Sequence, residues 1–381
     1  MQTILSDELL ERIRHRAAGY DARNEFFTED LEELAQVGYL GLFSPEKLGG
    51  LNLGLEEVAQ LQMRLAAAAP ATALGINMHL VWTGVARAFS DRGDTSLDWL
   101  LAEAAAGEIF AFGISEAGND SVLFDSDTVA TPTPGGYRFT GTKIFTSLSP
   151  AWTRLGIFGR DNSDPENPKL VYGFITRETS GYTISDDWNP LGMRATQSRS
   201  TVLDNVFVPA DRIIRILPVG PSADLLPFAI FANFELLLAS VYAGLGDRAL
   251  RLAVETVTTR RSKKTGEVYA NDPNIRWRIA SAAIEQAAVR PQILASARDV
   301  DALADHGPAW FPLFVGPKIR ATETARRVVD AAIRVSGGGS YRNDAELTRL
   351  YRDVVAGLFH PSDDESAHGT FADAYLGPIT S

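Results

Sequence analysis

The sequence predicts a mostly helical α+β protein in which two helical regions flank one region of strands. Three observations support this fold class: helical spacing of apolar residues up to residue 108, β-branched and aromatic runs over 109–222, and long helical patterns from 223 onward. A chain of 381 residues is also too long for one ordinary core. We therefore expect an N-terminal helical domain (1–108), a central β-barrel domain (109–222) and a C-terminal helical bundle domain (223–381).

The N-terminal region has helical periodicity in two clear stretches, Leu5-Leu9-Leu10-Ile13 and Leu31-Leu34-Val37-Leu40. Ser6 and Thr28 stand where helix N-caps belong, and each is followed by acidic residues that suit the positive end of a helix. This region is expected to be helical.

The central region begins with a hairpin pattern. Two β-type runs, Asp127–Thr133 and Tyr137–Thr140, are separated by the turn-forming Pro134-Gly135-Gly136. Three further runs follow without an intervening helix: Leu155–Phe158, Leu170–Ile175 and Thr201–Val208. The pattern therefore favours an antiparallel barrel or sandwich over βαβ units.

The C-terminal region is predicted to contain long helices. Residues Phe231–Thr259 are apolar on more than one face, as expected of a helix buried in a bundle. Asp272-Pro273 is a favourable helix start, because a capping side chain precedes a proline at the first helical position. A further helix over Ala321–Val335 is stopped by Gly337-Gly338-Gly339.

Composition narrows the classes of function. The formal net charge of -12 argues against binding to nucleic acid or to a membrane surface. The apolar runs are too short for a membrane span, and the charged N-terminus does not resemble a signal peptide. The absence of cysteine excludes disulfides and thiolate chemistry and fits a cytoplasmic protein. The five histidines are scattered, so no metal site is expected.

Two segments suggest a binding site for a flat cofactor. Phe112–Ser121 begins as a strand and continues as a loop of small and hydroxylated residues, which lets backbone N–H groups approach a polar-edged ring. In Gly141–Ser147, strand alternation places Phe145 and Ser147 on the same face. An aromatic ring beside a hydroxyl donor suits a flavin, with stacking on the ring and a hydrogen bond near its reactive nitrogen. Ordinary loop and strand packing is the alternative.

These segments belong to a set of motifs that resembles the acyl-CoA dehydrogenase superfamily. Ser115-Glu116-Ala117-Gly118, with Ser121 beyond it, resembles the family's Thr-Glu-Pro-Gly-x-Gly-Ser. Gly141–Ser147 is similar to its Gly-x-Lys-x-Trp-Ile-Thr. Three later elements match in order: Gly192–Ser198 with Val206–Pro209, Val335–Gly338, and Arg349–Asp353.

The resemblance implies a helical N-terminal domain, a central antiparallel β domain and a C-terminal four-helix bundle, with FAD or alternatively FMN between the last two. The residues that would contact the flavin are Phe112, Ile114, Ser115, Phe145, Thr146 and Ser147, and Ser121 would contact substrate. A neighbouring subunit would contribute Gly337, Gly338 and Arg261 to the far end of the cofactor. A homo-oligomer, commonly a tetramer, is therefore implied.

The catalytic base of the family is missing from its usual place. An acyl-CoA dehydrogenase removes an α-proton with a glutamate, and counting from Arg352 places Pro361 there, in His360-Pro361-Ser362-Asp363. Some relatives carry the glutamate at the start of the long bundle helix, and Glu235 lies within one residue of that position. One residue on a helix is about 100° of rotation, so the match is incomplete. The acidic residues 363–365 either supply a carboxylate or cap a helix over Ser366–Tyr375.

Two features resemble the flavin monooxygenase branch of the superfamily. They are the phrase Ala270-Asn-Asp-Pro273 ahead of the second bundle helix and a histidine at position 360. In that branch a partner reductase supplies reduced flavin, which reacts with oxygen in a histidine-lined pocket. His79 would be a second pocket histidine or a hydrogen-bonded histidine of the core.

Three interpretations follow. The first is dehydrogenation of an acyl-CoA or other thioester, with Glu235 or a displaced carboxylate as the base and an electron-transfer flavoprotein as a partner. The second is a two-component monooxygenase that uses His360 and His79 with a flavin reductase. The third is a flavin-binding subunit without catalysis. The first is preferred at this point because most of the superfamily oxidises thioesters.

Overall fold

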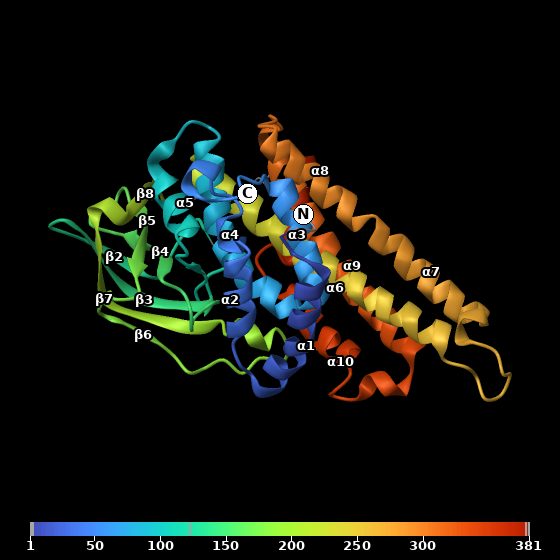
Figure 1. Cartoon of the computed structure of the whole chain (residues 1–381). Coiled ribbons are helices and arrows are strands. Elements are labelled where there is room, and N and C mark those ends of the chain that lie inside the picture. The colour runs from blue at the N-terminus through green and yellow to red at the C-terminus, as the bar shows by residue number, and fades with distance from the viewer. Residues whose placement is uncertain (1–3, 122, 378, 380–381) are drawn as a thin grey trace.

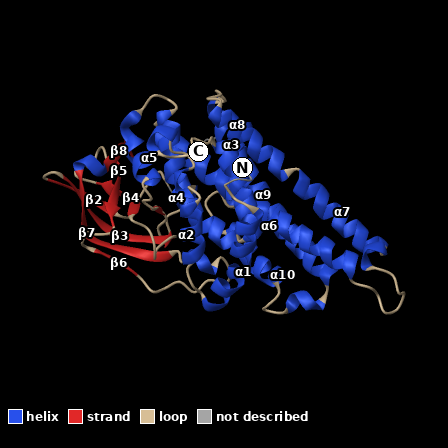
Figure 2. Cartoon of the chain, in the orientation of Figure 1, coloured by secondary structure: helices blue, strands red, loops and turns tan. Residues whose placement is uncertain are grey.

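The structure is a computed structural model that describes residues 4–121, 123–377 and 379 (Figure 1). Its sheet is central in the sequence but lies at one side of the molecule, and helices from both ends of the chain fill the other side (Figure 2). The expected fold class, mostly helical with a central sheet and C-terminal helices, is confirmed.

The N-terminal helices pack between the sheet and the C-terminal helices. They are α1 (Asp7–Arg23), α2 (Thr28–Gln36), α3 (Leu55–Ala68), α4 (Pro70–Ser90) and α5 (Asp98–Ala105). The hydroxyl of Ser6 accepts from the N–H of Leu9, so this N-cap is confirmed. Thr28 is instead the first residue of α2, and its predicted cap role is wrong because Phe27 occupies the cap position.

The strands form one open sheet in the order β6-β7-β3-β2-β4-β5-β8. Their bounds are β1 (Phe110–Gly113), β2 (Val129–Thr133), β3 (Gly136–Thr146), β4 (Arg154–Asp161), β5 (Lys169–Thr176), β6 (Tyr182–Ile184), β7 (Arg199–Pro209) and β8 (Ile213–Pro218). Neighbours are antiparallel except that β1 and β2 each pair parallel to β4. Strands β2 and β3 form the predicted hairpin, with Thr133 opposite Gly136. Only glycine fits at 136, because a Cβ there would lie 2.1 Å from the carbonyl oxygen of Val208.

The C-terminal helices are α6 (Leu225–Thr259), α7 (Pro273–Ala287), α8 (Val289–Asp301), α9 (Trp310–Ser336), α10 (Glu346–Val354) and α11 (Asp364–Leu376). The predicted start at Asp272-Pro273 and the predicted stop at Gly337 are both confirmed. Asp363 caps α11 by accepting from the N–H of Ser366, which is the second of the two roles expected of the acidic residues.

Helix α6 is the longest element and the centre of the helical part. By length and composition it resembles a membrane-spanning helix, yet 83% of its most apolar stretch is buried inside the protein. It packs against α3 and α4 of the N-terminal part and against α7, α8 and α9 of the C-terminal part. Its apolar faces are therefore explained by packing.

Candidate active site

The two segments expected to hold a cofactor lie side by side at one end of the sheet. The N–H of Ile144, in β3, donates to the carbonyl oxygen of Ser115 at 2.9 Å, just beyond the end of β1. Phe112 and Ile114 are buried, whereas Ser115 is partly exposed. The fold thus joins two motifs that are far apart in sequence.

A buried ion pair anchors the loop that follows β1. Nζ of Lys143 lies 2.6 Å from Oε1 of Glu116, and both side chains are almost fully buried. The two oxygens of Glu116 also accept hydrogen bonds from loop residues Asn119, Ser126, Asp127 and Thr128. Burial opposes ionisation of Glu116, but Lys143 and these donors outweigh it and lower the pKa of Glu116 to about 2. Burial lowers the pKa of Lys143 only to about 8, so both groups stay charged at neutral pH.

The expected alternation of Phe145 and Ser147 is wrong, because β3 bulges at its end. The register against β7 shifts between Lys143 and Thr146, and Phe145 has a positive φ of 55°. The N–H of Ser147 then donates to the carbonyl oxygen of Phe145 at 2.9 Å, which closes a tight turn. As a result Phe145 is 57% exposed while Ser147 is buried.

The same turn contains a polar group without a partner. The hydroxyl of Thr146 is buried and makes no hydrogen bond to any described residue. A buried unsatisfied hydroxyl costs free energy unless a ligand supplies its partner. The exposed Phe145 ring beside it offers a stacking surface. A flat ring with polar edges, such as a flavin, fits both features.

Ser147 begins a row of hydroxyl groups that continues into the loop before β7. Its Oγ lies 2.7 Å from Oγ of Ser198, which lies 2.7 Å from Oγ1 of Thr196. Thr196 Oγ1 in turn lies 2.9 Å from the carbonyl oxygen of Met193. Met193 and Gln197 have positive φ angles of 52° and 44°, so this loop is held in a strained conformation.

Helix α6 connects these segments to the predicted catalytic residues. The ring of Phe234 stacks on Phe112, with ring centroids 5.8 Å apart. Glu235 is the next residue and is rotated by about 100° around the helix axis. Tyr242 follows seven residues later, about two turns, and therefore lies on the same face as Glu235. Both side chains contact the loop between α10 and α11.

Three side chains fix this loop from two helices. From α6, the hydroxyl of Tyr242 lies 2.8 Å from Nε2 of His360, and Oε1 of Glu235 accepts from the hydroxyl of Ser362 at 2.7 Å. From α9, Nζ of Lys318 donates to the carbonyl oxygens of His360 and Ser362 at 3.2 and 2.7 Å. The structure thus brings together the two predicted catalytic residues, His360 and Glu235.

The charges in this cluster are only partly compensated. Burial raises the pKa of Glu235 to about 7, against the opposing effects of the Lys318 charge and the Ser362 hydroxyl. Oε2 of Glu235 has no hydrogen-bond partner among the described residues. Burial also lowers the pKa of Lys318. Desolvation and the nearby Lys318 charge lower the pKa of His360 to about 3, so its ring is neutral at physiological pH.

His79 lies in the core with both ring nitrogens engaged by the backbone. Nε2 donates to the carbonyl oxygen of Leu40 at 2.8 Å, and Nδ1 accepts from the N–H of Phe110 at 3.2 Å. Burial lowers its pKa to about 4, which keeps this neutral tautomer. No ring nitrogen is left for a substrate, so the geometry favours the second expected role, that of a core histidine tying α4 to β1.

The remaining predicted site residues lie elsewhere. Ser121 is exposed in the loop after β1. Gly337 and Gly338 follow α9, and the guanidinium of Arg260 donates to the carbonyl oxygen of Ser336 there, which places Arg261 at the same end of the bundle. Glu235 is on α6 and Arg260 is its C-cap, so the two are about 40 Å apart along the helix axis. One copy of the chain therefore does not bring Arg261, Gly337 and Gly338 to the same flavin as the predicted residues near Glu235.

Sequence reasoning missed Tyr242, Lys318 and Ser362. Tyr242 had a detectable signal, since it repeats the helical position of Glu235 after two turns. Lys318 had another, because it is the first charge after the apolar stretch Phe314–Pro317. Ser362 had none, because its contact with Glu235 depends on how the loop folds back.

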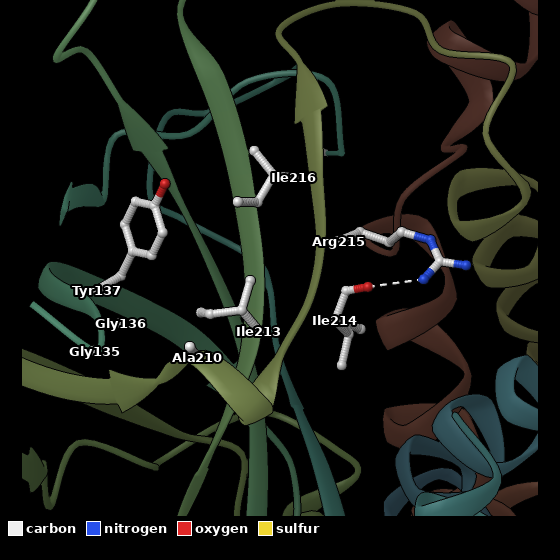
Figure 3. A pocket seen from close by; sticks show the side chains of 8 residues that line it. All are labelled: Gly135, Gly136, Tyr137, Ala210, Ile213, Ile214, Arg215 and Ile216. Carbon is white, nitrogen blue, oxygen red and sulfur yellow. Dashed lines mark hydrogen bonds between the residues drawn. The ribbon is translucent and has the colours of Figure 1, made fainter. Parts of the chain in front are cut away.

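A separate groove of about 580 Å³ lies on the sheet. It shares no residue with the Phe112–Ser121 and Gly141–Ser147 segments or with the residues that hold the 360–363 loop. Figure 3 shows Tyr137, Ile213 and Ile216 around it, while Arg215 points to the other side of β8 and donates to the carbonyl oxygen of Ile214. Its lining is apolar apart from Tyr137 and Arg215 and offers no group suited to catalysis.

Family models match both helical parts of the chain. Residues 4–91 match the acyl-CoA dehydrogenase N-terminal domain, and residues 236–364 match the acyl-CoA dehydrogenase C-terminal domain. The second range includes Tyr242, Lys318 and the 360–363 loop.

Individual relatives include oxygenating enzymes. L-evernosamine nitrososynthase from a Micromonospora species is 29% identical over 368 residues, which cover 92% of this chain and 84% of that protein. Dibenzothiophene monooxygenase from Rhodococcus qingshengii is 27% identical over 373 residues, covering 92% and 88%. The structure of KijD3 in complex with FMN and dTDP-3-amino-2,3,6-trideoxy-4-keto-3-methyl-D-glucose has a TM-score of 0.85 and 26% identity, covering 98% of this chain and 92% of that one.

Proposed function

The chain belongs to the acyl-CoA dehydrogenase superfamily and is a flavin-dependent enzyme, and we propose that it is a two-component monooxygenase. In this proposal a partner reductase supplies reduced flavin, FMN or FAD. One atom of O2 enters a small-molecule substrate and the other leaves as water. This replaces the thioester dehydrogenation that the sequence alone favoured.

The observation that carries the proposal is the chemistry of the loop where the superfamily's base is expected. Pro361 has no group that takes a proton, and the residue before it, His360, is a neutral imidazole. Its Nε2 is engaged by Tyr242, and Nδ1 makes no hydrogen bond to any described residue. The free Nδ1 is therefore suited to hydrogen-bond a reacting oxygen rather than to remove an α-proton as a charged base.

The proposed roles follow from this arrangement. Bound reduced flavin supplies the two electrons and two protons that balance the formation of water from the second oxygen atom. His360 orients that oxygen through Nδ1, and Tyr242 fixes the imidazole plane. Glu235 and Lys318 hold the loop, and Phe145, Thr146 and Ser147 hold the ring of the flavin. Phe112, Ile114 and Ser115 form the neighbouring wall.

The substrate class proposed is a small molecule with an oxidisable nitrogen or sulfur. The names of the relatives support it, since one is an L-evernosamine nitrososynthase and another a dibenzothiophene monooxygenase. Ser121, which is exposed in the loop after β1, is proposed to contact this substrate.

We also propose that the enzyme is a homo-oligomer. Trp277 and Ile284 on α7 are 70% and 74% exposed, on a helix with few buried residues along the outer face of the bundle (Figure 1). Arg261, Gly337 and Gly338 would then reach the far end of a flavin bound by another subunit.

One observation supports a second candidate, thioester dehydrogenation with Glu235 as the base. Its carboxylate is buried, one oxygen is free, and its pKa is about 7, as a base for an α-proton requires. The first candidate is preferred because Glu235 is already bonded to Ser362 and serves the loop.

Isotope labelling tests the first candidate. The protein is mixed with reduced FMN, 18O2 and two probes, dibenzothiophene and a thymidine diphosphate amino sugar. We expect one 18O atom in one of the products, and an about 100-fold lower rate in His360→Asn. The exposed His368 provides the control, since His368→Asn should keep the rate. Anaerobic bleaching of bound oxidised flavin by butyryl-CoA, abolished by Glu235→Gln, would contradict the proposal and establish the second candidate.

A further inference from the structure

The row of hydroxyl groups that begins at Ser147 has only one possible arrangement of hydrogens. The row contains three short oxygen–oxygen contacts: Ser147 to Ser198, Ser198 to Thr196, and Thr196 to the carbonyl of Met193. Each contact needs one hydrogen, and a hydroxyl supplies one while a carbonyl supplies none. Thr196 must therefore donate to Met193, Ser198 to Thr196, and Ser147 to Ser198.

This arrangement uses the only hydrogen of the Ser147 hydroxyl. What remains on its oxygen is a lone pair, so Ser147 presents an acceptor to any ligand in the site. The sequence had suggested a hydroxyl donor at this position, and the row reverses that expectation.

The row is held firmly at its carbonyl end. The N–H of Met193 donates to the buried carboxylate of Asp353 at 2.6 Å, which fixes the peptide next to the terminal carbonyl. The Leu148 N–H donates to the carbonyl oxygen of Thr196 at 3.2 Å. The positive φ angles of Leu148, Met193 and Gln197 hold the two loops in this register. Ser147 is thus a preorganised acceptor.

We propose that the acceptor oxygen of Ser147 selects the reduced form of the flavin at ring nitrogen N5. N5 carries a hydrogen in reduced flavin and a lone pair in oxidised flavin. Ser147 would accept from the first and would oppose lone pair to lone pair with the second, which is discrimination by an unfavourable contact. The inference rests on the proposed function, in which the enzyme takes up flavin in the reduced state and releases it oxidised.

The test compares binding of oxidised FMN with anaerobic binding of dithionite-reduced FMN. Wild-type protein should bind the reduced form more tightly. Ser198→Ala frees the Ser147 hydrogen to donate to oxidised N5, so the ratio of the two dissociation constants should shift about tenfold toward the oxidised form. The midpoint potential of the bound flavin should fall by about 30 mV, which is the same tenfold change for two electrons.

Thr196→Val provides a second variant. It removes the acceptor used by Ser198, whose hydrogen can then turn to Ser147, and the ratio should shift in the same direction. Ser149→Ala is the control, because that buried hydroxyl lies in the same turn but donates to the carbonyl oxygen of Thr146, outside the row. Its ratio should equal that of wild type.

The outcome separates this inference from the proposed function. An unchanged ratio in both Ser198→Ala and Thr196→Val would overturn the inference, even if 18O enters a probe substrate. A shifted ratio would support it, even if no probe is oxygenated and the proposed function fails.

Discussion

Two buried glutamate–lysine pairs in this molecule have opposite electrostatic properties. Glu116 and Lys143 touch at 2.6 Å, and the pKa of Glu116 falls to about 2. Lys318 instead donates to two backbone carbonyls, Glu235 accepts from Ser362, and the pKa of Glu235 rises to about 7. The residue types and the burial are similar, so geometry causes the difference.

The comparison distinguishes a fully satisfied ion pair from an incompletely satisfied one. In the first pair both carboxylate oxygens are bonded, and the pair holds the loop after β1 against β3. In the second, one oxygen of Glu235 lacks a partner among the described residues and its charge is unstable in its surroundings. Perturbed, incompletely satisfied ionisable groups concentrate at functional sites. The burial of a charged pair alone would not have separated the two.

Breaking the Glu116–Lys143 pair should have the largest effect on stability. Lys143→Met leaves Glu116 as a buried charge without its cation, so we expect the free energy of unfolding to fall by about 3–5 kcal/mol. Urea titration measures it. Lys169→Met, which removes a surface ammonium bonded to Asn167, should change it by less than about 0.5 kcal/mol. A loss in Lys143→Met no larger than in this control would contradict the anchor role.

The two glutamates should also give opposite pH dependences. The folded pKa of Glu116 lies below its ordinary value of 4.5, so its contribution to stability is present above pH 4.5 and is lost as pH falls toward 2. The folded pKa of Glu235 lies above 4.5, so its contribution is present below pH 4.5 and is lost as pH rises through 7. Each amounts to about 3 kcal/mol at most.

Matched variants isolate these terms. The free energy of unfolding of wild type minus that of Glu235→Gln should decrease as pH rises from 4.5 to 8. The free energy of unfolding of wild type minus that of Glu116→Gln should decrease as pH falls below 4.5. Chemical denaturation across this pH range measures both. Slopes of the same sign in the two variants would refute the comparison.

Replacing Lys318 should lower the free energy of unfolding by less than replacing Lys143. Lys318→Met leaves two carbonyls without a donor, for a loss of about 1–3 kcal/mol. Glu235 can respond by taking up a proton, so we expect a smaller loss at pH 6 than at pH 8. Urea titrations at the two pH values give the answer, and equal losses would show that Glu235 does not respond to Lys318.

The smallest effect on stability is expected for Tyr242→Phe. This change removes one neutral hydrogen bond to His360, worth about 1 kcal/mol. If Tyr242 fixes the imidazole plane, the oxygenation rate should fall about tenfold with little change in stability. Thermal melting and labelled-oxygen assays on the same preparation separate the two. An unchanged rate would remove Tyr242 from the proposed site.

The sequence predicts the features that depend on a short window. Asp272-Pro273 and the Pro134-Gly135-Gly136 turn act on their immediate neighbours, and the helix and the hairpin they predict are present. The end of β3 is different, because the bulge at Phe145 arises from its register against β7. Periodicity assumes a regular strand and does not detect such a shift.

The candidate site shows the same limit more strongly. His360 and Glu235 were recognised individually, from motif positions. Their connection through Ser362, Tyr242 and Lys318 depends on how α6 and α9 pack around a loop more than 100 residues from Glu235 in the sequence. The direction of the hydroxyl row likewise requires Ser147 and Ser198 to meet, which only the paired strands arrange.

The placement of the 360–363 loop has a consequence for how such an enzyme diversifies. The loop is held by side chains from two helices, while the segments proposed to face the flavin are fixed by the separate network around Glu116 and Lys143. Replacements within these few residues can therefore exchange a proton-abstracting group for an imidazole without disturbing the cofactor framework. The type of reaction can therefore change during evolution while the scaffold stays the same.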